Sequence, residues 1–324
     1  MTTRPTDAEI DAIAKRLAPF NTRMILTGAG FSRPWGGYLA AELWSLIISE
    51  PSIRSRVELD RVLHDELNFE EVLARIEVSE TSDFNDDDRR VMRAAVTNAF
   101  ELQEQQIKQK GSFLIGSNPD LERMLINFTA RPTRGTTCFF TLNQDLLMER
   151  LPKFQGDFGF VIPGVTWGSD PQFTKVDDFS PTPFEALAGK RAYLKLHGSM
   201  SWHAAHGDVA VLGGAKKAAI DQFDILRMNN AIFRQALMQQ DARLLVIGYG
   251  FADDHINETI GLGLDRGLKL WIVDPREPAS IRERLSHRGR IWHSVVGHYR
   301  GPATDLFAPG TIEEHFFRDR FWPF

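Results

Sequence analysis

Three polar side chains that could carry chemistry each follow a run of apolar residues. Asn143 and Asp145 come shortly after the run Thr136–Thr141, and His197 comes directly after the run Ala192–Leu196. Amide and carboxylate side chains supply hydrogen-bond donors and acceptors together, so they can hold a carboxamide and ribose hydroxyls. An imidazole can act as a general base near neutral pH. These residues are therefore candidates for a site that binds and activates a polar ligand.

Each of these residues also has a purely structural interpretation. Asp145 stands where it could cap a helix over residues 146–150, and a histidine at the end of a strand is often a satisfied structural residue. His203 and His206 lie near His197 in the sequence and raise the question of a metal. No third acidic or thiol ligand lies at zinc-like spacing, so we predict no metal site.

Two glycine turns follow further apolar runs. The first, Gly28–Ser32 (GAGFS), comes after Thr22–Leu26, and the second begins at Gly248, after Arg243–Ile247. Glycine permits tight turns and close approach of the backbone, and backbone N–H groups at the start of a helix favour an anion such as a phosphate. A plain turn is the alternative for the first segment. The second could admit the far half of a dinucleotide.

An acidic residue ends one more apolar run. Asp274 follows Lys269–Val273 and is placed for a contact with an adenosine ribose, or else it is a turn residue before Pro275. Asp253 and Asp254 are good helix caps, so capping is their alternative to a role in binding.

The apolar runs also predict the fold. Five strand-like runs each end at a small or polar cluster, and helical patterns occur between them, as in an α/β protein. We therefore predict a Rossmann-like, doubly wound and mainly parallel sheet, in which ligands bind at the carboxyl ends of the strands. Helices are expected at about residues 8–17 and 39–48 and from about residue 255.

A large helical insertion is predicted within a single domain that spans residues 1–324. From about residue 50 to 132, apolar residues recur at helical spacing and few β-branched runs occur. The segment is too long for a simple crossover between two strands, so we expect a lid or an oligomerisation surface. The aromatic tail at residues 318–324 is expected to pack against the body or a partner.

Composition excludes several classes of protein. The chain has 324 residues and a formal net charge of −5, which argues against a dedicated nucleic-acid binder. Its one cysteine, Cys138, excludes an intrachain disulfide and a zinc site built from two CxxC motifs, and it favours a reducing cytoplasm. No apolar run approaches the ~20 residues of a membrane-spanning helix. The charged N-terminus does not resemble a secretory signal.

The order of the motifs is more informative than any one of them. The segments GAGFS, TLNQD, KLHGS and GYGF, at successive strand ends, resemble the sirtuin (silent information regulator) family. The stretch LVIGYGFADDHIN is more similar to the sirtuin-like domains of bacterial phage-defence proteins than to protein deacetylases. This resemblance implies a Rossmann-like fold that binds NAD⁺.

The resemblance also implies roles for particular residues. Asn143 would contact the nicotinamide ribose and position the attacking water, Asp145 would hold the carboxamide, and His197 would be the base. The rest of the cofactor would lie against Gly28, Ala29, Gly30, Ser32, Gly248 and Asp274.

Two departures from the family bear on the reaction. Deacetylating sirtuins carry a four-cysteine zinc module between the histidine and the later glycine turn, but no cysteine lies between His197 and Gly248. The usual Pro-Asp-Phe-Arg stretch after the first loop is replaced by residues 34–38 (PWGGY). We therefore expect hydrolysis of NAD⁺ to nicotinamide and ADP-ribose. The alternatives are NAD-dependent deacylation, ADP-ribosyl transfer, and a non-catalytic sensor of NAD⁺ or ADP-ribose.

An enzyme that depletes its own cell of NAD⁺ needs control. We therefore expect gating by homo-oligomer assembly, by a regulatory partner protein of a defence operon, or by both. The role in anti-phage defence is implied by the family resemblance. No membrane or direct nucleic-acid contact is expected.

Overall fold

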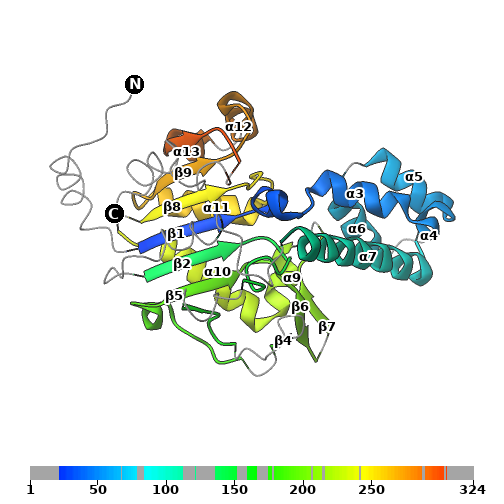
Figure 1. Cartoon of the computed structure of the whole chain (residues 1–324), viewed down its shortest axis with the longest axis horizontal. Helices are drawn as coiled ribbons and strands as arrows, with labels where there is room; N and C mark the ends of the chain where they lie inside the picture. The colour runs from blue at the N-terminus through cyan, green and yellow to red at the C-terminus, as the bar shows by residue number, and fades with distance from the viewer. Residues whose placement is uncertain are drawn as a thin grey trace.

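A computed structural model describes most of the chain (Figure 1). The described residues are 22–66, 68–78, 84–111, 121, 136–151, 159–165, 174–176, 179–205, 207–213, 216–240, 242–286, 289–302 and 304. The helix predicted at residues 8–17 and the tail at residues 318–324 lie outside them.

Seven parallel strands form the main sheet, in the order β10-β9-β8-β1-β2-β5-β3. The strands are β1 (Thr22–Thr27), β2 (Thr136–Thr141), β3 (Phe160–Val161), β5 (Arg191–Lys195), β8 (Arg243–Ile247), β9 (Lys269–Val273) and β10 (Val295–Tyr299). Every residue of β2 and β8 is buried. Parallel strands covered on both faces have this continuous apolar character.

The chain reverses direction across the sheet beside β1. It runs from β1 to β2 and β5 on one side and then returns to place β8, β9 and β10 on the other side. This is a doubly wound arrangement with its switch point between β1 and β8, so the predicted Rossmann-like fold is confirmed. The five predicted strands are β1, β2, β5, β8 and β9.

Alternating residues of the central strands enter two separate cores. Met24 and Leu26 of β1 pack on the same face as Phe140 of β2, and Ile25 packs on the opposite face with Phe139. The helices and short helical turns outside the insertion are α2 (Ala29–Ser32), η1 (Arg33–Trp35), η3 (Phe184–Leu187), α9 (Lys216–Gln222), α10 (Asp224–Leu237), α11 (Asp254–Leu264), α12 (Pro278–Arg284) and α13 (Gly289–His293).

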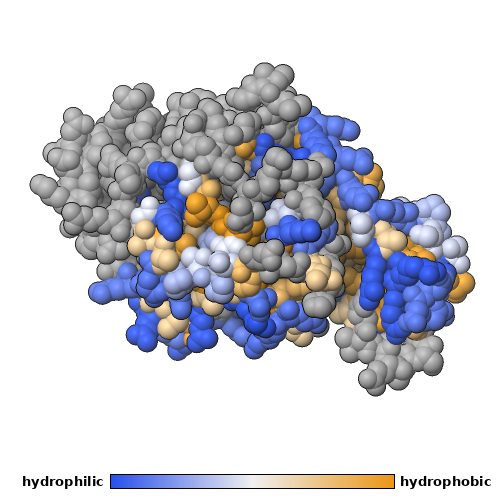
Figure 2. All heavy atoms as spheres, turned by 90° about the horizontal axis from the view of Figure 1, so that it is seen from below, coloured by the Kyte–Doolittle hydropathy of each residue, from blue (hydrophilic) through white to orange (hydrophobic). Residues whose placement is uncertain are grey.

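A group of helices between β1 and β2 has its own core. They are α3 (Ala40–Ser49), α4 (Pro51–Arg54), α5 (Val57–Asp65), α6 (Phe69–Val78) and α7 (Asp86–Gly111). In Figure 1 they lie beyond the carboxyl ends of the central strands. Hydrophilic side chains dominate their surface on the face shown in Figure 2. Most of residues 112–132 lies outside the described residues, so the predicted end of the insertion stays a prediction, as does the single domain.

Three short strands that were not predicted form a second sheet. It has the order β4-β6-β7, with β4 at Thr174–Lys175, β6 at Gly198–Ala204 and β7 at Gly207–Ala210. Within the described part of the chain, no helix is long and apolar enough to cross a membrane.

Candidate functional site

The two glycine turns touch each other at the switch point of the sheet. The Gly30 N–H donates a hydrogen bond to the Gly248 carbonyl oxygen over 2.9 Å. Gly248 has a φ of +63°, and a Cβ there would lie 2.3 Å from the backbone nitrogen of Phe31. A Cβ at Gly28 would lie 2.8 Å from the Gly248 oxygen. Glycine is therefore required for the packing of the two turns, and the predicted contact with phosphate stays a separate prediction.

Ser32, Asn143 and Asp145 form one chain of hydrogen bonds. The Asn143 side-chain amide donates to Ser32 Oγ over 2.8 Å and to the Gly28 carbonyl over 3.1 Å. Ser32 Oγ in turn donates to Asp145 Oδ2 over 2.7 Å. The structure thus brings Ser32 into contact with Asn143 and Asp145, which lie 111 and 113 positions later in the sequence.

Asp145 also accepts a backbone hydrogen bond, as its predicted alternative role as a cap requires. Its Oδ1 accepts the backbone N–H of Leu147 over 3.1 Å, as a capping carboxylate does, although residues 147–150 form a turn and not the predicted helix. Asp145 is 6% exposed. Burial, with the nearby charge of Glu104, raises the pKa of Asp145 to about 6, although Lys195 and the bond from Ser32 favour its ionised form.

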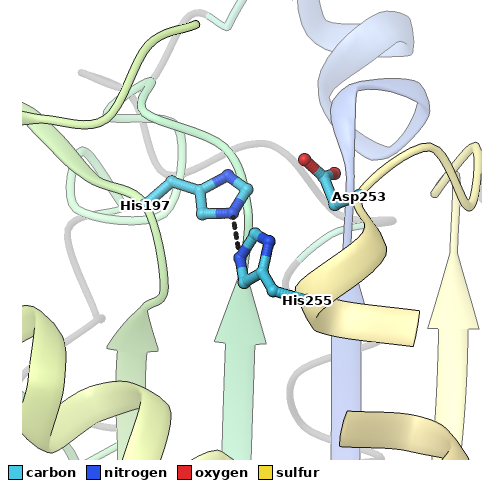
Figure 3. Close-up of side chains that lie close together, drawn as sticks. All are labelled: His197, Asp253 and His255. Carbon is cyan, nitrogen blue, oxygen red and sulfur yellow. Dashed lines mark hydrogen bonds between the residues drawn. The ribbon is translucent and has the colours of Figure 1, made fainter. Parts of the chain in front are cut away.

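His197 lies buried in the turn that follows β5, with 4% of its surface exposed. Its Nε2 is 3.1 Å from Nε2 of His255, in the first turn of α11 (Figure 3). Burial lowers the pKa of His197 to about 3, against the opposing effect of Asp253, so the imidazole is neutral near pH 7. A neutral imidazole can accept a proton.

An ion network lies beside the two histidines. Lys216 Nζ is 2.7 Å from Glu70 Oε2 and also forms an ion pair with Asp253. Burial opposes ionisation of Asp253, but His197 and Lys216 hold the pKa of this carboxyl below its usual value. The network therefore joins α6 of the insertion to α9 and to the loop before α11.

A pocket of about 120 Å³ lies between the sheet and the insertion. Four predicted site residues line it: Ala29, Asn143, Asp145 and His197. The predicted insertion contributes side chains from α6 and α7, and α3, which precedes the predicted insertion, contributes two more: Phe69, Glu70, Phe100 and Gln103 from α6 and α7, and Ala40 and Leu43 from α3. Sites for whole drug-sized ligands have volumes of about 300–1,000 Å³, so this pocket has room for one part of a dinucleotide.

Asp274 lies apart from the residues that line the pocket. Both of its carboxylate oxygens bind Arg276, at 2.8 Å to Nε and 2.6 Å to Nη2. Asp274 Oδ1 also accepts the Arg276 backbone N–H over 2.9 Å, which is a turn contact. The turn interpretation is therefore observed, and the contact with an adenosine ribose stays a prediction.

A buried ion pair supports the loop that carries Asn143 and Asp145. Lys195 Nζ, at the end of β5, lies 2.7 Å from Glu149 Oε1 and donates to the Asp145 carbonyl over 2.6 Å. It also donates to Ser199 Oγ over 2.8 Å. Sequence reasoning missed this lysine, although a charged residue inside an apolar run was a signal that could have identified it.

Sequence reasoning also missed His255 and Lys216. The segment Asp253–Asp254–His255 directly after a glycine turn was a usable signal, but nothing local indicated that His255 would meet His197. Ligand atoms of His197, Asp253 and His255 lie within 4.8 Å of one another. Lys216 forms an ion pair with one carboxylate oxygen of Asp253. His206, the other histidine near His203 in the sequence, lies outside the described residues. The predicted absence of a metal stays a prediction.

The fold and pocket define an α/β protein with a polar site at the carboxyl ends of a doubly wound parallel sheet. Residues 137–292 match the family model of the SIR2-like domain. The chain therefore contains a sirtuin-like domain, as the order of its motifs predicted. The match includes Asn143, His197 and Gly248 and begins after the first glycine turn.

Several solved structures are similar to the chain. One is a Sir2 homologue in complex with NAD, with 13% identity, a TM-score of 0.48 and coverage of 100% of this chain and 97% of that chain. Another is a mutant Sir2 homologue in complex with ADP-ribose, with 13% identity, a TM-score of 0.47 and coverage of 95% and 96%. No curated protein matches the chain.

Proposed function

We propose that this chain hydrolyses NAD⁺ to nicotinamide and ADP-ribose. One observation carries the proposal. Asn143, Asp145 and a neutral, buried His197 line the same pocket at the carboxyl ends of the parallel strands. The sirtuin-like domain supports NAD⁺ as the ligand. The absence of cysteine between His197 and Gly248 favours hydrolysis over deacylation.

The pocket is assigned to the nicotinamide half of the substrate. The small volume and the polar side chains suit the carboxamide and its ribose. The remaining half would then extend past the two glycine turns towards Asp274 on β9. Each carboxylate oxygen of Asp145 accepts one protein hydrogen bond and keeps capacity for a second, from the carboxamide.

Little covalent assistance is needed for this reaction. Nicotinamide is a cationic leaving group, so the C–N bond electrons return to the ring nitrogen as the bond breaks. The protein holds the ribose in a reactive pose and directs water to the anomeric carbon. Asn143 positions this water and His197 accepts its proton.

Incubation of the purified chain with NAD⁺, followed by chromatography, tests the proposal. We expect nicotinamide and ADP-ribose in equal amounts, from the chain alone or once the protein encoded by a neighbouring gene is added; the difference between these two conditions measures any control by that protein. Nicotinamide release only when an acylated peptide or a protein acceptor is added would instead assign deacylation or transfer. Stable binding of intact NAD⁺ under all of these conditions would assign a sensor.

We further propose that the activity is regulated and serves anti-phage defence in the cytoplasm. The resemblance of the segment around Gly248 to phage-defence proteins supports this role, and self-assembly or a partner protein would provide the control. The insertion is a suitable element, because side chains of its helices α6 and α7 line the pocket. Constant turnover by a monomer at low protein concentration would contradict the regulation.

The pKa of Asp145 predicts the acidic side of the pH profile. A carboxyl with a raised pKa of about 6 is ionised only above that pH, and its protonated form can no longer accept hydrogen bonds at both oxygens. We therefore expect kcat/KM for NAD⁺ to fall about tenfold per pH unit below pH 6. Asp145→Asn should lower the plateau and remove this decline.

Measurement of kcat/KM between about pH 4.5 and 7.5, a range of about one and a half units on either side of that pKa, checks the prediction. Asp65→Asn, at an exposed position of α5, is the control and should keep the wild-type profile. A decline through pH 6 that persists in Asp145→Asn would assign the titration to another group.

A further inference from the structure

Two imidazole rings face each other at the edge of the pocket. The Nε2 atoms of His197 and His255 are 3.1 Å apart, with ring centroids at 5.1 Å and an angle of 39° between the planes (Figure 3). Burial lowers the pKa of both rings, so both are neutral near pH 7. Two lone pairs at this distance would repel, so one ring donates its N–H to the other.

The direction of that hydrogen bond decides whether His197 can be a base. Among the described residues, no side chain or backbone group forms a hydrogen bond with Nδ1 of His197, and His197 lines the pocket. If His197 donates through Nε2, its Nδ1 carries a lone pair. If His255 donates instead, Nδ1 of His197 carries a hydrogen and cannot accept a proton.

The loop that carries His255 is held firmly. Phe251 has a φ of +56° although it is not glycine, a conformation that persists only where surrounding contacts enforce it. Tyr249 OH accepts the Asp253 N–H over 3.1 Å and donates to Asn257 Oδ1 over 3.2 Å. Asn257 Nδ2 donates to the Phe251 carbonyl over 3.0 Å. These bonds fix the start of α11, and with it the place of His255.

We propose that His255 is a positioning residue, which accepts the Nε2 hydrogen of His197 and so keeps the lone pair of His197 on Nδ1. This inference rests on the proposed hydrolysis. As the water oxygen bonds to the anomeric carbon, the C–N bond breaks with its electrons on nicotinamide, and the water proton moves to Nδ1 of His197. The Nε2 hydrogen stays shared with His255. The extra proton is released to solvent with the products.

Charged groups around the pair set the stability of the imidazolium that forms. Asp253 favours the positive charge on both rings, and Lys216 opposes it. Near His255, Glu258 favours positive charge and Lys217 opposes it. Glu70 balances Lys216 through their ion pair. Because these effects oppose one another, the hydrogen bond to His255 is the directional contact that selects the tautomer.

Two substitutions separate this role from simple packing. His255→Leu fills the space without an acceptor, whereas the side-chain oxygen of His255→Gln can accept the Nε2 hydrogen. We expect His255→Leu to lower kcat for NAD⁺ about 10–100-fold with little change in KM, as for other partners that orient an imidazole. His255→Gln should recover most of this loss. His64→Leu, on the exposed surface of α5, is the control.

Nitrogen-15 NMR of the histidine rings reads the tautomer directly in the full chain without substrate. We expect wild type and His255→Gln to show Nδ1 of His197 unprotonated, and His255→Leu to lose this preference. A protonated Nδ1 in the wild type would overturn the inference. So would an unchanged kcat in folded His255→Leu, or stoichiometric bound zinc that is lost with His255. If the wild type does not consume NAD⁺, hydrolysis fails as the function, while the spectrum still decides the tautomer.

Discussion

Replacement of His197 by alanine is expected to lower the rate of NAD⁺ consumption by about 10²–10⁴-fold, the usual contribution of a general base. The attacking water would keep Asn143 but would lose the group that takes its proton. The imidazole is neutral because burial lowers its pKa to about 3, so protonation of His197 does not limit the wild type between pH 5 and 8.

The measurement is the initial rate of nicotinamide release by purified protein at saturating NAD⁺. Thermal unfolding of the same preparations shows whether the variant is folded, because a buried side chain is removed. His197→Gln, which preserves more of the side-chain volume, should lose similar activity. His64→Ala, on the exposed surface of α5, should retain wild-type turnover. Undiminished NAD⁺ loss in folded His197→Ala would contradict the proposed hydrolysis.

The central strands could be predicted because their burial requires a local run of apolar residues in the sequence. The runs that form β2, β8 and β9 consist mostly of apolar, aromatic or β-branched residues, and their predicted bounds match the structure. By contrast, β10 is only partly buried along its length, so its sequence lacks that pattern. The helix α10 has clear apolar periodicity and could have been predicted from it.

The site was predicted in part, for a different reason. A doubly wound sheet brings strand ends together whatever the intervening sequence, so residues after β2 and β5 meet on one pocket. Residues that reach the site from other helices and loops show no sequence pattern that would indicate their contacts. His255 lies 58 positions from His197, and Glu70 reaches Lys216 from the insertion. These pairings depend on tertiary packing, which the spacing of residues in one sequence does not reveal.

The buried pair of Lys195 and Glu149 carries the largest expected effect on stability. The two side chains are 0% and 2% exposed. Lys195→Met would leave the Glu149 carboxylate buried with the hydroxyl of Tyr193, which donates to its Oε2 over 3.2 Å. Removal of one partner from a buried pair lowers the free energy of unfolding by about 3–5 kcal/mol. Urea unfolding of the wild type and the variant measures this difference.

Comparison with an exposed pair separates burial from charge. Arg61 is more than half exposed and pairs with Glu58 and Asp65 on α5, so Arg61→Met should change the unfolding free energy by less than about 1 kcal/mol. Glu149→Leu combined with Lys195→Met removes the unpaired carboxylate, and we expect the double variant to recover much of the loss. A loss below about 1 kcal/mol in Lys195→Met would mean that water reaches the carboxylate. The pair would then not hold the loop of Asn143 and Asp145 rigid.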